Sequence, residues 1–122
     1  GTGDPSAFLA VSDAIKFQQN NNWESVKKIC RDLTRLTRDR ICEVIHSNPI
    51  CPNSEEWLGQ MASVEVPNVN SLNLKNELMS KYNIEIPVFT WKNKNYLRVS
   101  FNAYNDETDA DKLVSALQQL LA

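Results

Sequence analysis

The stretch Asn95–Asp106, NYLRVSFNAYND, carries one residue suited to binding chemistry, Arg98. Apolar and polar residues alternate along it, which is the period of a strand with one buried and one polar side. Arg98 falls on the polar side, where it could pair with a surface carboxylate such as Glu65 or Glu85. It could instead hold a ligand carboxylate or phosphate, because a guanidinium offers a planar fork of donors. The alternation alone favours the surface pair.

The N-terminal stretch GTGDPSAFLAVSDAIKF places a second candidate, Thr2, just before a predicted helix. Free backbone N–H groups and the helix dipole make such a position attractive to an anion. A simpler explanation needs no ligand, because Asp4 can act as the N-cap and Pro5 can occupy the first helical position. The helix that follows has an apolar stripe formed by Phe8, Val11 and Ile15.

Six of the thirteen cations lie on the next predicted helix: Lys27, Lys28, Arg31, Arg35, Arg38 and Arg40. Such a group could follow the phosphates of a nucleic acid. Acidic residues are interleaved with it, however, and Glu24 stands four residues before Lys28, a spacing typical of a solvated helix face. No RNA-type aromatic motif or glycine-rich loop accompanies the cations. We therefore expect no nucleic-acid binding.

The cysteines and the histidine do not form a recognisable catalytic or metal site. Cys30, Cys42 and Cys51 are odd in number and lack a Cys-x-x-Cys pair, which favours a reducing compartment and small buried apolar roles. His46 is the only histidine, and no nucleophile–base pair or Gly-x-Ser-x-Gly motif is present. We expect no catalytic residue and no metal ligand in this chain.

Composition predicts one globular domain over residues 1–122. Hydrophobic residues make up 42% and charged residues 23%, which suffices for a single core. A net charge of −2 gives no general reason to bind nucleic acid or an anionic membrane. No apolar run approaches the roughly 20 residues that a membrane span needs. No signal-peptide pattern opens the sequence, so a cytoplasmic location is expected.

Hydrophobic periodicity predicts four helices and three strands. The helices are expected over Ser6–Asn20, Trp23–His46, Leu72–Tyr82 and Glu107–Leu121, and the strands over Gln60–Val66, Ile84–Trp91 and from Asn95 onward. Pro87 places the second strand at an edge or a bulge. This order makes an α+β domain, with a small, mostly antiparallel three-stranded sheet and helices packed on one face. Arg98 then belongs to the opposite, open face.

The two ends of the chain together resemble a known family. GTGDPSAFLAVSDAIKF and YLRVSFNAYNDETDADKLVSAL are similar to the C-terminal portion of class V aminotransferases, which are pyridoxal-phosphate enzymes of the aspartate aminotransferase fold. The most similar branch is the isopenicillin N epimerase-like one, with cysteine desulfurases as more distant relatives. The resemblance extends over essentially the whole chain, although the segment Cys51–Asn76 carries no matching motif. Gly3 departs from the family pattern, which often has a larger, basic residue there.

The resemblance implies that this is the small C-terminal domain of a two-domain enzyme whose large, cofactor-lysine domain is absent from the sequence. It implies that Arg98 binds the α-carboxylate of an amino-acid substrate. It implies that Thr2 touches the phosphate of a cofactor held by the other subunit of a homodimer. Pyridoxal 5′-phosphate would belong to the full-length parent, and this domain alone would bind no cofactor and catalyse nothing. Transamination, epimerisation and desulfuration all remain open as reactions of the parent.

A second hypothesis comes from a different class of protein. A free-standing α+β module could recognise a peptide or RNA through its open sheet face. The coding sequence upstream of Gly1 would separate the two, because only the enzyme hypothesis requires a large α/β domain with a cofactor lysine there.

Overall fold

A computed structural model describes residues 3–121 of the chain. Its elements are α1 (Ser6–Asn20), α2 (Trp23–Val44), β1 (Met61–Glu65), α3 (Ser71–Tyr82), β2 (Val88–Trp91), β3 (Lys94–Ser100) and α4 (Glu107–Leu121). The predicted order and the α+β class are confirmed. The differences lie at the ends of elements: α2 stops two residues early, and β2 begins only after Pro87.

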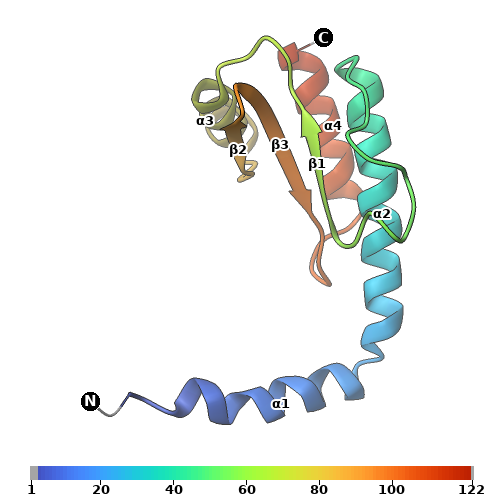
Figure 1. The fold of residues 1–122 in the computed structure, drawn as a ribbon, viewed down its shortest axis with the longest axis vertical. Coiled ribbons are helices and arrows are strands. Elements are labelled where there is room, and N and C mark those ends of the chain that lie inside the picture. Colours follow the sequence, from blue (N-terminus) through green and yellow to red (C-terminus); the bar gives the residue numbers. More distant parts are fainter. Residues whose placement is uncertain (1–2, 122) are drawn as a thin grey trace.

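The three strands form one antiparallel sheet in the order β1-β3-β2. The strand that carries Arg98 is therefore central, and β2 lies at an edge, as Pro87 predicted (Figure 1). A two-residue turn joins β2 to β3, and both of its residues, Lys92 and Asn93, have left-handed backbone conformations. Such turns match the natural twist of a hairpin, which explains the tight connection.

The helices α2 and α4 pack side by side behind the sheet (Figure 1). Side chains that alternate along the strands, such as Val64 on β1 and Leu97 on β3, are almost fully buried against Ile41 and Leu117 of the two helices. The helix α3 covers the edge at β2 and contributes Leu78 to the same core. The core thus fixes which face of β3 is buried, and it leaves the alternate residues on the other face.

The helix α1 lies outside the layer of helices that packs on the sheet. It has the predicted bounds, yet none of its residues is buried, and Figure 1 shows it lying apart from the sheet. The apolar stripe is real but exposed: Phe8 is 82% exposed and Ile15 is 51% exposed. The one aromatic contact at this end joins Phe17 to Trp23, whose ring centroids are 5.9 Å apart.

Arg38 contradicts the assignment of the α2 cations to a solvated face, because only 2% of this side chain is exposed. Its Nη1 donates to the carbonyl of Cys51 at 2.7 Å, and its Nε and Nη2 donate to Asp39 Oδ1 at 3.0 and 2.7 Å. Asp39 in turn accepts a hydrogen bond from the Asn53 side chain. Arg38 therefore anchors the α2–β1 loop to α2. The other five cations keep the expected exposed or half-exposed positions.

Cys30 and Cys42 are buried, as predicted, and Cys51 is half-buried in the loop. Burial raises the pKa of the Cys42 thiol. Within residues 3–121, the acidic, cysteine and histidine side chains form no group of three or more that could hold a metal ion. None of the described helices is long and apolar enough to cross a membrane.

Candidate functional site

The side of the sheet opposite α2 and α4, called the open face here, is the candidate site. The strand register places nine alternate residues on it: Met61, Ser63, Glu65, Phe89, Trp91, Lys94, Tyr96, Arg98 and Ser100. In this register Ser63 of β1 lies beside Arg98 of β3. Tyr96 of β3 lies between Glu65 of β1 and Phe89 of β2. Arg98 thus lies in the middle of a face whose position is fixed by the core behind it.

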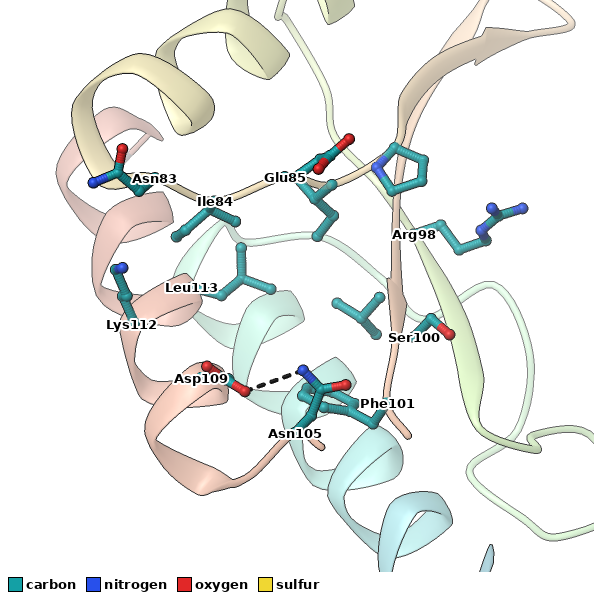
Figure 2. A pocket seen from close by; sticks show the side chains of 13 residues that line it. Asn83, Ile84, Glu85, Arg98, Ser100, Phe101, Asn105, Asp109, Lys112 and Leu113 are labelled. Carbon is teal, nitrogen blue, oxygen red and sulfur yellow. Dashed lines mark hydrogen bonds between the residues drawn. The ribbon is translucent and has the colours of Figure 1, made fainter. Parts of the chain in front are cut away.

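The local backbone holds Arg98 firmly, while its side chain is exposed. Its N–H donates to the carbonyl of Pro87 at 3.0 Å. This hydrogen bond ties the backbone of β3 at Arg98 to the residue that precedes β2. Figure 2 shows the Arg98 side chain extending from β3 on the side away from Leu113 and Phe101. A rigid backbone with an exposed guanidinium is suited to binding a planar anion.

Neither of the two surface carboxylates considered for Arg98 forms an ion pair with it. Glu65 accepts a hydrogen bond from Lys94 at 2.8 Å, and this contact raises the pKa of Lys94. Glu85 lies near the strand but makes no ion pair with any cation among residues 3–121. Over the same described residues, the Arg98 side chain has no hydrogen-bond partner either. The interpretation of Arg98 as half of a surface pair with Glu65 or Glu85 is therefore wrong.

A cavity of about 250 Å³ opens beside Arg98, just before β2 begins, where β3 has no paired strand on that side. It lies between the segment 83–87, the end of β3 and the first turns of α4. Asp109 and Lys112 of α4 line it, and Asn105 Nδ2 donates to Asp109 Oδ2 at 3.1 Å (Figure 2). The guanidinium of Arg98 extends away from this cavity, so an anion bound by Arg98 would lie on the open face.

Three aromatic residues gather on the open face next to Arg98, and sequence reasoning did not single them out. Tyr96 is 9% exposed, and its ring stacks with that of Phe89 at a centroid distance of 5.8 Å. The ring centroids of Trp91 and Tyr96 are 6.3 Å apart. With Ile50 of the α2–β1 loop and Ser63 they line a second cavity of about 320 Å³. The available signal was the spacing of Phe89 and Trp91, which puts both on one face of an edge strand.

Thr2 lies outside the described residues, so its predicted contact has no structural counterpart here. The start of α1 that follows it differs slightly from the prediction. Pro5 occupies the N-cap position itself, and Asp4 Oδ1 accepts a hydrogen bond from the Ser6 N–H at 2.9 Å. Hydrogen bonds from the Ser6 hydroxyl and N–H lower the pKa of Asp4. These contacts complete a helix start without any ligand.

The last helix begins with Asp106 as its cap. Its Oδ1 accepts hydrogen bonds from the N–H groups of Thr108 and Asp109 at 2.8 and 3.2 Å. The side chain of Asn105 accepts from the N–H of Asn102 at 3.1 Å and closes the turn after β3. These residues therefore have structural roles, whereas the Arg98 side chain has no partner among residues 3–121.

On the open face, Arg98 offers one cationic fork, which fits a carboxylate. The N-terminus of α4 borders the cavity beside Arg98, but the N–H groups of Thr108 and Asp109 there already donate to Asp106 and are not free for a cofactor phosphate.

No family model matches the chain. Individual curated proteins do: isopenicillin N epimerase from Amycolatopsis lactamdurans is 31% identical over 121 residues, which make up 98% of this chain and 30% of that protein. Isopenicillin N epimerase from Streptomyces clavuligerus is 28% identical with the same shares. The chain spans about 30% of the length of these relatives.

Solved structures resemble the chain over its whole length. A cysteine desulfurase from Thermococcus onnurineus matches with a TM-score of 0.80 at 13% identity, over 99% of this chain and 32% of that one. A cysteine desulfurase from Escherichia coli matches with a TM-score of 0.74 at 19% identity, over 100% of this chain and 32% of that one. At these identities the likeness concerns the fold alone. Together with the epimerase matches, it shows that the chain belongs to the class V aminotransferase family, in its isopenicillin N epimerase-like branch.

Proposed function

We propose that this chain is the C-terminal domain of a pyridoxal-phosphate enzyme acting on an amino acid, and that Arg98 binds the substrate carboxylate. One observation carries the proposal: the central strand of the sheet presents an exposed arginine with no partner among residues 3–121. The match to epimerases over 98% of the chain, which is 30% of their length, agrees with a domain cut from a larger protein.

The chemical role of Arg98 follows from its geometry. Bound pyridoxal phosphate supplies the electron sink, and the protein decides which bond of the substrate is aligned for reaction. A guanidinium that binds both carboxylate oxygens fixes the orientation of the amino acid. A charged hydrogen bond of this kind contributes about 1.5–3 kcal/mol. Arg98 therefore binds and orients the substrate without taking part in proton transfer.

The remaining parts of the parent enzyme complete the proposal. A large domain of the same chain would supply the cofactor lysine, and a second subunit of a homodimer would receive the Thr2 contact at its cofactor phosphate. The domain by itself would bind no cofactor and would not catalyse the reaction, which in the parent would be transamination, epimerisation or desulfuration. The enzyme would act in the cytoplasm.

The test is Arg98→Lys in the full-length parent. A lysine keeps the charge but loses the two-pronged fork, so the Michaelis constant for amino acids should rise roughly 10- to 100-fold, the equivalent of about 1.5–3 kcal/mol. Cofactor absorbance near 420 nm should stay unchanged. An unchanged Michaelis constant would remove Arg98 from the substrate site.

Arg40→Lys is the matched control. Arg40 lies on α2, is 45% exposed and pairs with Asp111 of α4 at 2.7 Å, behind the sheet and away from the open face. The same arginine-to-lysine change there should leave the Michaelis constant as it is. A coding sequence without a large α/β domain upstream of Gly1 would instead favour a free-standing peptide- or RNA-binding module.

A further inference from the structure

We propose that the aromatic residues Phe89, Trp91 and Tyr96, called the aromatic wall here, bind the side chain of the amino-acid substrate and select a neutral, apolar or aromatic one. This inference rests on the proposed function, because it takes the substrate carboxylate to be at Arg98. It adds the substrate class, which the family assignment leaves open. Three observations support it: the position of the wall, its charge and its shape.

The position is set by the strand register. Tyr96 precedes Arg98 by two residues on the same strand, so both point to the open face with Cα atoms roughly 7 Å apart. Phe89 lies directly opposite Tyr96 on β2. An amino acid whose carboxylate is held by Arg98 therefore has the aromatic wall within reach of its side chain, because the two sites are neighbours on one rigid sheet.

The charge of the cavity excludes ionised side chains. Its lining residues are Ile50, Ser63 and the aromatic wall, and none of them carries a charge. The nearby carboxylate of Glu65 is already neutralised by Lys94 at 2.8 Å. A carboxylate or ammonium group entering this cavity would lose water and find no ion-pair partner among the lining residues, which is unfavourable. The Trp91 ring, which could attract a cation, is already covered by Lys92, whose Nζ lies 4.5 Å from the ring centroid. A neutral apolar side chain has no charge to desolvate, so it does not pay this cost.

The shape of the cavity suits a side chain of moderate size. Tyr96 forms its floor with 9% of its surface exposed, while Phe89 at 37% and Trp91 at 57% remain open to contact. Ile50 closes one side and stands next to Cys51, whose carbonyl is fixed by Arg38 at 2.7 Å. The space of about 320 Å³ is enough for a phenyl ring or a branched aliphatic chain.

The first test compares amino acids as substrates of the full-length parent. Apolar and aromatic amino acids should have kcat/KM values at least about tenfold above those of acidic and basic ones of similar length, which is the discrimination expected of an apolar pocket. Calorimetry of the cofactor-free full-length protein should give dissociation constants in the same order. A preference for acidic or basic amino acids in both measurements would overturn the inference.

The second test uses Phe89→Ala with Met61→Ala as its control. Met61 lies on the same open face and is 54% exposed, but it does not line the cavity. Phe89→Ala should lower kcat/KM for phenylalanine or leucine about tenfold and leave alanine unaffected, because a methyl group does not reach the wall. Met61→Ala should change neither. Equal losses for alanine and phenylalanine would contradict a side-chain site.

The Arg98→Lys variant keeps the two proposals distinguishable. If Arg98→Lys weakens all amino acids but Phe89→Ala shows no selectivity, the carboxylate site stands and the aromatic wall fails, being only a surface that packs against another domain. If Arg98→Lys has no effect, the proposed function itself fails.

Discussion

Arg38 is, among residues 3–121, the one charged side chain that the fold buries almost completely, with 2% of its surface exposed, and Arg38→Met removes it. Methionine keeps much of the apolar stem of the arginine, so packing changes little, whereas the guanidinium and its hydrogen bonds to Cys51 and Asp39 disappear. The question is whether those hydrogen bonds outweigh the cost of burying the charge.

The magnitude follows from the partners. The bond from Nη1 to the Cys51 carbonyl is short, at 2.7 Å, and a charged hydrogen bond of this kind contributes about 1.5–3 kcal/mol. The two bonds to Asp39 add little, because 48% of that side chain is exposed and an ion pair open to water is worth about 0–1 kcal/mol. We expect Arg38→Met to lower the free energy of unfolding by about 2–3 kcal/mol.

Urea unfolding followed by tryptophan fluorescence measures this change, with Trp57 reporting from the same loop. Arg40→Met is the control, since its ion pair with Asp111 is 45% and 62% exposed and should contribute less than about 1 kcal/mol. Buried ion pairs can be replaced by apolar residues without loss in some proteins. An Arg38→Met chain as stable as the original would show that Arg38 does not anchor the loop.

Two further predictions concern buried groups of α2. The Thr37 hydroxyl is, among the buried side-chain nitrogen and oxygen atoms of residues 3–121, the one without a hydrogen-bond partner. Thr37→Val should therefore raise the free energy of unfolding by about 1 kcal/mol in the same assay; a decrease would reveal a hidden partner. Burial raises the pKa of the Cys42 thiol, so at pH 8 iodoacetamide should alkylate the half-buried Cys51 well before Cys42. The stability linked to the raised pKa of Cys42 is complete below the pKa of the unfolded thiol, about 8.5, and is lost as the pH rises through the higher folded value. Equal labelling rates at pH 8 would contradict the burial.

The elements were predictable because their signals are local. The two-residue period placed Leu97 and Val99 in the core and Arg98 opposite them, and the structure confirms this. Pro87 marked the edge strand because it cannot donate to a ladder. The Asp106 cap of α4 is also local, because Asp is a residue type that such positions favour.

What the sequence did not reveal depends on contacts between distant segments. Arg38 looked like its exposed neighbours, and only the return of the loop at Cys51 buries it. Phe89 and Trp91 of β2 form the aromatic wall only because the pairing with β3 places Tyr96 in contact with both of their rings. The stripe on α1 predicted an amphipathic helix correctly, but periodicity does not say which surface covers it.

The position of α1 bears on how the chain unfolds. Every buried residue of the core comes from positions after α1, so this 15-residue helix contributes no shared interior with the sheet. Isolated helices of this length are marginal in water. The helix and the core therefore do not form one cooperative unit in the chain by itself. Circular dichroism, which reports on all helical residues, should lose part of its signal at denaturant concentrations below those that unfold the core.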